Sequence, residues 1–308
     1  MQTPWGDCAV WDAHVHFFSR RFFDSLAAQA GKPVETIATT LGWELPPPDP
    51  VKLGERWIAE LDAQGVERSA LIASMPGDEA SVTAAASASG SRLLAYAMVN
   101  PLDGKPPSLA GLHAVCLFPA MHGYFIFDPR VEPVLEQAEA RGALVFVHCG
   151  VLTVGVRNKL GLPSPFDMRY SNPIDLQAVA RRHPKLNFIV PHFGAGYFRE
   201  ALMLANLCSN IYLDTSSSNN WMKFEGLDLK TVFRRALDVV GPGRLLFGTD
   251  SSFFPRGWHR AIFEEQTEAL ASAGVTNAGA RLILSENLQR LTATTPLARP
   301  PEYSASSG

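Results

Sequence analysis

Short apolar runs alternate along the chain with segments in which apolar residues recur every three to four positions. Most of the runs are continuously apolar, which is typical of parallel strands that are buried on both faces. The periodic segments between them indicate amphipathic helices. The expected strands are Ala9–Val15, Ser69–Ser74, Leu93–Val99, Ala114–Phe118, Leu144–Val147, Asn187–Val190, Ile211–Asp214 and Leu245–Gly248. This alternation predicts a parallel α/β architecture.

Helices are expected between and after these strands. They are Leu53–Gln64, Pro129–Arg141, Pro173–His183, Tyr197–Cys208, Leu227–Val240, His259–Ala273 and Asn277–Leu291. Eight strands interleaved with helices in 308 residues predict a single (β/α)8 barrel, the TIM barrel. The rival is an open, doubly wound sheet, which would place a Gly-rich phosphate loop after the first strand. The chain has His14-Val15-His16 there instead.

Two connections are long, Phe17–Lys52 after the first strand and Cys149–Asn172 after the fifth. Loops of this length in compact domains are usually lids, binding loops or disordered segments. We expect the barrel to occupy residues 1–295, followed by a Pro/Ser-rich C-terminal tail, 296–308.

Composition narrows the class of protein. Hydrophobic residues make up 46% and charged residues 19%, as in a globular enzyme with a large core. A net charge of −3 gives no basic footprint for nucleic acid, and neither a secretory signal nor a bilayer-spanning apolar run is visible. The four cysteines lack paired spacing, which favours reduced thiols in the cytoplasm. We therefore expect a cytoplasmic protein that acts on a small molecule, without nucleic-acid or membrane partners, and with a homodimer as a common assembly for such enzymes.

The strongest chemical signal is the sequence Asp12-Ala13-His14-Val15-His16. Alternate residues of a strand share a face, so Asp12, His14 and His16 are expected to point the same way. Two imidazoles side by side at the end of a strand can chelate a metal. Partly buried histidines bonded to the backbone are the alternative interpretation.

Three further polar residues end apolar strands. His148 follows the fifth expected strand, His192 the sixth, and Asp250 the eighth. The ends of barrel strands converge on one rim, where TIM-barrel enzymes carry their active sites. The four strand ends together therefore predict one polar site.

This pattern resembles the amidohydrolase superfamily, which has HxH on the first strand and His, His and Asp on the fifth, sixth and eighth. The surrounding sequence is similar to the branch that includes aminocarboxymuconate semialdehyde decarboxylase. Segments that carry the resemblance are Asn172–Leu176, His192–Gly196, Ile211–Ser216, Leu246–Asp250 and Ile283–Asn287. The resemblance extends from Trp11 to about Leu291.

The resemblance implies that His14, His16, His148 and Asp250 bind one divalent ion, with His192 and Asp250 catalytic. Imidazoles with one carboxylate suit zinc, with manganese, iron or cobalt as competitors. Asp12 is expected to orient the histidines without binding the ion.

The fourth strand decides between one metal and two. Binuclear members of the superfamily carry a carboxylated lysine on this strand, and Cys116 stands at the aligned position. We interpret Cys116 as a buried core thiol beside a mononuclear site. A thiolate that bridges two metals is the alternative.

Substrate contacts are expected from loops at the rim. His122 follows the fourth strand, Arg157 lies in the fifth loop with Lys159, and Arg256 follows the eighth strand. An arginine near a metal can bind a substrate carboxylate. Three tryptophans that could form an aromatic wall are Trp43, Trp221 and Trp258.

The resemblance leaves two reactions open. In hydrolysis of a C–N or lactone C–O bond, metal-activated water attacks, Asp250 takes the proton, and His192 polarises the carbonyl. In non-oxidative decarboxylation, the substrate carboxylate chelates the metal and His192 or Asp250 protonates the adjacent carbon. Hydration of an unsaturated acid and a barrel without activity are the lesser alternatives.

Overall fold

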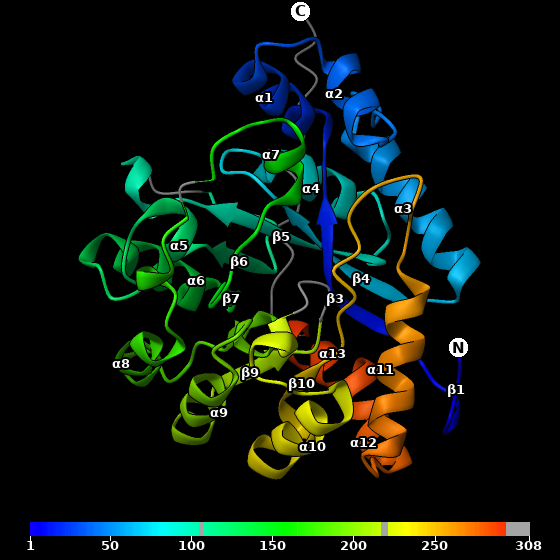
Figure 1. Ribbon diagram of the computed structural model, residues 1–308, viewed down its shortest axis with the longest axis vertical. Helices are drawn as coiled ribbons and strands as arrows, with labels where there is room; N and C mark the ends of the chain where they lie inside the picture. The colour runs from blue at the N-terminus through cyan, green and yellow to red at the C-terminus, as the bar shows by residue number, and fades with distance from the viewer. Residues whose placement is uncertain (105–107, 165, 217–220, 294–308) are drawn as a thin grey trace, which may run out of the picture.

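The computed structural model describes residues 1–104, 108–164, 166–216 and 221–293. Its main sheet has eight parallel strands whose spatial order follows the chain from β3 to β10 (Figure 1). They are β3 (Trp11–Phe17), β4 (Arg68–Ala73), β5 (Leu93–Val99), β6 (Ala114–Leu117), β7 (Leu144–Val147), β8 (Phe188–Val190), β9 (Ile211–Asp214) and β10 (Leu245–Leu246). All eight expected strands are therefore confirmed. Two short strands, β1 (Gln2–Thr3) and β2 (Gly6–Asp7), form a separate N-terminal hairpin.

The sheet closes into a barrel between β3 and the segment that follows β10. The amide of Ala13 donates to the carbonyl of Phe247 at 2.8 Å, and that of His16 donates to Ser251 at 2.7 Å. In the other direction, the amide of Asp250 donates to the carbonyl of His14 at 2.9 Å. These bonds leave neither end strand with an open edge, which confirms the TIM barrel.

Side chains divide into two apolar layers. The barrel interior is filled by one cluster, in which Tyr96, Phe146 and Ile189 are almost fully buried. A second, larger cluster lies between the strands and the surrounding helices, and it includes Leu71, Val145 and Leu213. Both faces of each strand are covered, which explains the continuously apolar runs in the sequence.

Six outer helices agree with the sequence prediction to within a few residues. They are α3 (Pro50–Gln64), α6 (Glu132–Arg141), α8 (Leu176–Arg182), α9 (Phe198–Leu207), α10 (Leu229–Val240) and α11 (Arg260–Ser272). The last expected helix is divided by a π-helical turn, Leu282–Glu286, into α12 (Asn277–Arg281) and α13 (Asn287–Thr292). At this turn the carbonyl of Ile283 accepts from the amide of Phe247, so the wider turn joins the helix to the barrel.

Five helices were not expected from the sequence. They are α1 (Arg20–Ala30), α2 (Val34–Leu41), α4 (Glu79–Ser87), α5 (Pro119–His122) and α7 (Gly155–Lys159). The apolar stripe of α4 is made mostly of alanines, so its sequence period is weak. It packs on α3, where a Cβ at Gly54 would lie only 2.9 Å from that of Ala85. Tertiary packing on a small neighbour therefore compensates for the weak pattern.

The long connections after β3 and β7 meet above the strand ends. There α1, α2 and α7 share an apolar cluster that includes Phe23, Leu26, Ile37 and Val156. Figure 1 shows these helices beyond the tip of β3. We call α1, α2 and α7 the cap.

None of the helices in the described ranges is both long and apolar enough to cross a membrane. The predicted tail, 296–308, lies outside those ranges.

Candidate metal centre

We call the junction between β3 and the segment after β10, residues 247–251, the barrel seam. Three side chains of the seam bring metal-binding atoms together. They are His14 and His16 on β3 and Asp250 after β10, and one donor atom of each lies within 4.8 Å of the other two. The Oδ1 of Asp250 is 3.0 Å from Nε2 of His16 and 3.6 Å from Nε2 of His14. Such separations fit donors that surround one ion, because Zn–N and Zn–O bonds are about 2.0–2.2 Å long.

The backbone at the seam fixes these three residues relative to one another. The amide of Asp250 is bonded to the carbonyl of His14, and the carbonyl of Ser251 is bonded to the amide of His16. Asp250 has a φ of 57°, in the left-handed region that non-glycine residues rarely adopt. This local strain is maintained by the surrounding hydrogen bonds, as is common at functional sites.

Each histidine of the group has its other ring nitrogen bonded to an orienting partner. His14 Nδ1 lies 2.6 Å from Oδ2 of Asp214, and His16 Nδ1 lies 2.6 Å from Oγ of Ser74. A carboxylate only accepts, so Nδ1 of His14 carries a proton, and Nε2 is the nitrogen that would lose its proton to bind an ion. This arrangement is usual for histidines that bind metals, and the donor set therefore fits a divalent ion.

Asp214 is a functional residue that the sequence reasoning missed, as is Ser74. Asp214 ends β9 and is completely buried. Burial alone would raise the pKa of Asp214, but the adjacent His14 outweighs burial and lowers it. For His14, burial lowers the pKa and Asp214 more than reverses this, raising it to about 9. The signal was present, since Asp214 also ends an apolar strand, as His148 and His192 do.

Gly248 makes room for this pair. A Cβ at Gly248 would lie 2.7 Å from Oδ1 of Asp214 and 3.0 Å from Cβ of His14. The first contact is shorter than real Cβ atoms show and the second is tight, so the close approach of the segment after β10 to the His14–Asp214 pair favours glycine.

Asp12 does not share a face with His14 and His16, contrary to the prediction. The register between β3 and β4 shifts between Asp12 and Val15, which interrupts the alternation of side chains. The Asp12 carboxylate accepts from the amide of His14 at 2.9 Å and from the indole of Trp258 at 2.7 Å. It also accepts from the hydroxyl of Thr249. Asp12 thus contacts the main chain of His14, whereas Asp214 contacts its ring.

His192 lies beside the three-residue group. Its ring centroid is 4.9 Å from that of His14, and its Nδ1 is 3.1 Å from the carbonyl oxygen of Ser216 and 2.8 Å from the hydroxyl. His192 and Phe193 both have left-handed backbones, with φ values of 55° and 52°. Burial lowers the pKa of His192, which keeps the ring neutral at pH 7.

The turn after β8 that holds His192 packs against the start of the loop after β7. The amide of Val151 donates to the carbonyl of Ala195 at 2.8 Å. A Cβ at Gly150 would lie 2.1 Å from the carbonyl oxygen of Gly194. Only glycine permits this contact between the two loops, which supports the strained turn.

His148 lines the same cavity but is not a member of the converging group of three. Its ring stacks on Phe118 with centroids 5.2 Å apart and lies edge-on to His192 at 5.5 Å. Its Nδ1 is buried and has no hydrogen-bond partner among the described residues. Burial lowers the pKa of His148 well below its ordinary value, so the ring is a neutral ligand candidate.

Cys116 points into the barrel interior, where it packs in the same cluster as Tyr96 and Phe118. Phe118 lines the cavity, whereas Cys116 does not appear in the lining that the described residues form. Burial raises the pKa of the Cys116 thiol well above its ordinary value. These observations agree with a core thiol and give no support to a bridging thiolate.

The donors open into a cavity of about 450 Å³. One wall is a row of stacked aromatic rings. Phe18 stacks on Trp43 with centroids 5.3 Å apart, and Trp43 stacks on Phe253 with centroids 4.3 Å apart. Lys159 and Arg256 also line the cavity. In the described part of the chain, neither cation forms a salt bridge with a carboxylate.

The residues predicted to contact substrate are distributed over three places. Arg256 lines the metal cavity, and its Nη2 donates to Ser252 at 2.8 Å. Arg157 instead lines a neighbouring pocket. His122 does not belong to the described lining of either one, and its ring stacks on Tyr124. Of the three tryptophans, Trp43 lines the metal cavity, whereas Trp221 and Trp258 are buried in the outer core.

Solved structures that are similar in fold to this chain include enzymes and an uncharacterised barrel protein. A 5-carboxyvanillate decarboxylase of Novosphingobium aromaticivorans, solved with manganese, has a TM-score of 0.63 and 13% identity, covering 93% of this chain and 96% of that chain. A Pseudomonas putida protein assigned as a 2-pyrone-4,6-dicarboxylic acid hydrolase has a TM-score of 0.60 and 17% identity, covering 94% and 99%. A zinc-bound amidohydrolase of Burkholderia multivorans has a TM-score of 0.60 and 16% identity, covering 93% and 100%. These identities establish the fold alone.

Two comparisons concern the sequence itself. The protein fluG of Emericella nidulans is 34% identical over 85 residues, which are 28% of this chain but only 10% of that protein. This match is local and leaves most of fluG uncovered. The model of the amidohydrolase family, by contrast, matches residues 11–291, from the start of β3 almost to the end of α13. The chain therefore belongs to the amidohydrolase family.

Proposed function

We propose that the chain is a divalent-metal-dependent hydrolase that cleaves a C–N or lactone C–O bond of a small carboxylated substrate. The observation that carries this proposal is the convergence of His14, His16 and Asp250, with Asp214 and Ser74 orienting the two imidazoles. His148 and His192 line the same cavity, and we propose His148 as a further ligand. Zinc is the proposed ion, in a single site. A bound divalent ion would supply Lewis-acid activation of water and of the scissile carbonyl.

Asp250 and His192 are the proposed catalytic residues. Burial would raise the pKa of Asp250, but the hydrogen bond from His16 and the nearby His14 lower it, so the carboxylate is ionised and able to accept a proton. The carbonyl of Ser216 can only accept, so its contact with Nδ1 of His192 favours a proton on that atom. A neutral His192 then presents an accepting Nε2, which suits a proton acceptor better than the carbonyl-polarising donor expected from the sequence.

The cationic residues of the cavity support an acidic substrate. Lys159 and Arg256 line it, and Asp250 is the one carboxylate in the described lining. Burial lowers the pKa of Arg256, although not enough to remove its charge at neutral pH. A substrate carboxylate in the cavity would be attracted to these cations.

Decarboxylation of an aromatic acid is the second candidate. It is favoured by Phe18, Trp43 and Phe253, whose stacked rings give one wall of the cavity an aromatic character. The resemblance in fold to a 5-carboxyvanillate decarboxylase is consistent with it. The same residues serve both reactions, because the difference lies in which substrate group faces the histidines.

The test begins with metal content. Protein purified without chelator is expected to contain about one divalent ion per chain, and the His14→Ala, His16→Ala double variant is expected to contain none. Reconstituted protein is then assayed on amides and lactones of aromatic acids for hydrolysis of the C–N or C–O bond, and on the free acids for CO2 release. Hydrolysis supports the hydrolase and CO2 release supports the decarboxylase. Metal retained by the double variant would refute the assigned ligands.

We also propose a cytoplasmic location and a homodimeric assembly. All four cysteines are unpaired and buried, which is consistent with a reducing cytoplasm. A homodimer is proposed as the assembly, since Met203 and Leu207 expose apolar surface on α9. Sedimentation equilibrium at micromolar concentration gives the mass of the particle, and a monomeric mass would contradict the dimer.

A further inference from the structure

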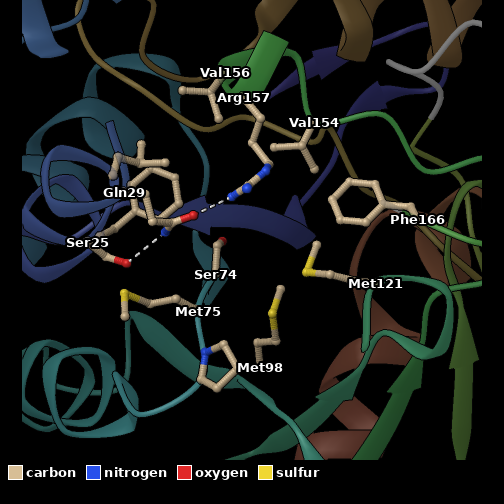
Figure 2. A pocket seen from close by; sticks show the side chains of 13 residues that line it. Ser25, Gln29, Ser74, Met75, Met98, Met121, Val154, Val156, Arg157 and Phe166 are labelled. Atoms are coloured by element: carbon tan, nitrogen blue, oxygen red, sulfur yellow. Dashed lines mark hydrogen bonds between the residues drawn. The ribbon is translucent and has the colours of Figure 1, made fainter. Parts of the chain in front are cut away.

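A second pocket of about 320 Å³ adjoins the metal cavity, and we call it the side pocket. It lies between the cap and the ends of the strands (Figure 2). Ser74, Met98 and Met121 line both the side pocket and the metal cavity. The two spaces therefore share a wall.

Ser74 links the side pocket to the metal centre. Its hydroxyl is 2.6 Å from Nδ1 of His16, the ring whose other nitrogen faces Asp250. The side pocket thus begins one residue away from a proposed metal ligand. A group that extends from a reacting centre at His16 past Ser74 would enter it.

The lining of the side pocket is mainly apolar and adaptable. Met75, Met98 and Met121 lie along one side, with Phe166 near them in Figure 2. Met98 is almost fully buried. Methionine side chains are unbranched and polarizable, so they adjust to ligands of different shape. The apolar part of this lining suits an alkyl or aryl group, and Arg157 is the one cation among the described lining residues.

A polar bridge between α1 and α7 limits the far side of the pocket. The guanidinium of Arg157 donates to Oε1 of Gln29 at 2.8 Å, and the amide of Gln29 donates to the hydroxyl of Ser25 at 3.2 Å. Arg157 also donates to the carbonyl of Pro163 at 2.8 Å. These residues join the two long loops across the pocket (Figure 2), so the bridge limits how far an apolar group can extend.

We propose that the side pocket binds an apolar arm of the substrate, while the reacting group of the same molecule lies at His14, His16 and Asp250. The substrate class is then an elongated, amphiphilic acyl compound rather than a compact aromatic acid alone. The length of the arm is selected by the bridge of Ser25, Gln29 and Arg157. This inference rests on the proposed function, because it needs the reacting group to be anchored at the metal centre.

Linear alkyl hydroxamic acids test the inference, because their head group chelates metals and their chain length can be varied. Affinities for zinc-loaded protein are measured by calorimetry from acetohydroxamate to decanohydroxamate. We expect the affinity to rise about fourfold for each added methylene and to level off once the side pocket is filled. An affinity that does not change with chain length would overturn the inference.

A matched pair of variants tests where the alkyl chain of the hydroxamate binds. Ser25 lines the side pocket but not the metal cavity, so Ser25→Trp should fill the side pocket. Thr36→Trp adds the same side chain at an exposed position on α2. Ser25→Trp is expected to remove the gain from chain length and leave acetohydroxamate affinity unchanged, and Thr36→Trp is expected to change neither. If affinity still rises with alkyl chain length in Ser25→Trp, the alkyl chain binds outside the side pocket and the inference is refuted.

Failure of the metal site would give a different result. If acetohydroxamate does not bind zinc-loaded protein, the proposed metal centre fails whatever the side pocket does. Octanoate is then titrated into chelator-treated protein, where metal plays no part. Binding that is lost in Ser25→Trp and kept in Thr36→Trp would support the side pocket by itself. Binding that is absent, or equal in all three proteins, would overturn it.

Discussion

The barrel seam and the cap form opposite kinds of surface around one cavity. At the seam, His14, His16 and Asp250 are fixed by main-chain hydrogen bonds between β3 and the segment after β10, and by buried polar partners. The cap contributes helices that pack through apolar side chains such as Leu26, Ile37 and Val156. The seam places atoms for chemistry, where small displacements are costly. The cap encloses volume, where apolar contacts tolerate exchange of similar side chains.

The most severe test of the seam removes the buried charge of Asp214. In Asp214→Ala, His14 loses its orienting carboxylate, and an uncompensated buried group remains. We expect a loss of about 3–5 kcal/mol in the free energy of unfolding and loss of metal, measured by urea denaturation and elemental analysis. Asp62→Ala is the control, because its exposed salt bridge with Arg92 should contribute about 0–1 kcal/mol. Equal effects in the two variants would contradict the role given to Asp214.

Gly248→Ala tests the close packing of the seam without removing a polar group. The added methyl group would press on Asp214 and His14, and we expect about 1–3 kcal/mol of destabilisation with weaker metal binding. Gly243→Ala is the matched control, since a Cβ there has nothing within 4 Å. Thermal unfolding of both variants measures the change in stability, and metal titration measures the change in metal affinity. Unchanged metal affinity in Gly248→Ala would show that the seam adapts.

His113 lies outside both the seam and the cap, and it tests whether the rest of the barrel makes the stability of the protein depend on pH. It precedes β6, and burial, helped by the charge of Arg68, lowers its pKa from 6.5 to about 4. Between these pH values the unfolded chain binds more protons than the native protein, so stability falls as pH decreases from about 6.5 toward 4. We expect about 2 kcal/mol of this loss between pH 7 and 5. His113→Asn should reduce this part of the slope in urea denaturation, and an unchanged slope would refute the assignment.

The smallest expected effect compares one methylene in each region. Ile37 in the cap and Ile211 in β9 are both completely buried, and Ile→Val typically costs about 0.5–1.5 kcal/mol. Ile211→Val should lower the free energy of global unfolding. Ile37→Val should instead increase amide hydrogen exchange in α1, α2 and α7, with metal content unchanged. Identical exchange patterns in the two variants would show that cap and barrel unfold as one unit.

The sequence identified the strands well because each is a short apolar run that is buried on both faces, and several of these runs have a polar residue at their end. It was less successful with helices such as α4, whose alanine-rich face has little apolar contrast. It also misjudged the face of Asp12, because a shift in register between neighbouring strands leaves no periodic trace in one of them. The left-handed backbones of His192 and Asp250 were equally invisible, since neither residue is glycine.

The sequence by itself determined the barrel, its polar rim and the residues His14, His16, His148, His192 and Asp250 as candidates. Local pattern sufficed for this, because strand ends in a parallel barrel must meet at one rim. Only the tertiary structure decided that Asp214 orients His14, that His122 lies outside the lining formed by the described residues, and that Arg157 lines the side pocket. These outcomes depend on contacts between residues as far as 200 positions apart, and no local pattern records which distant side chain will fill a given space.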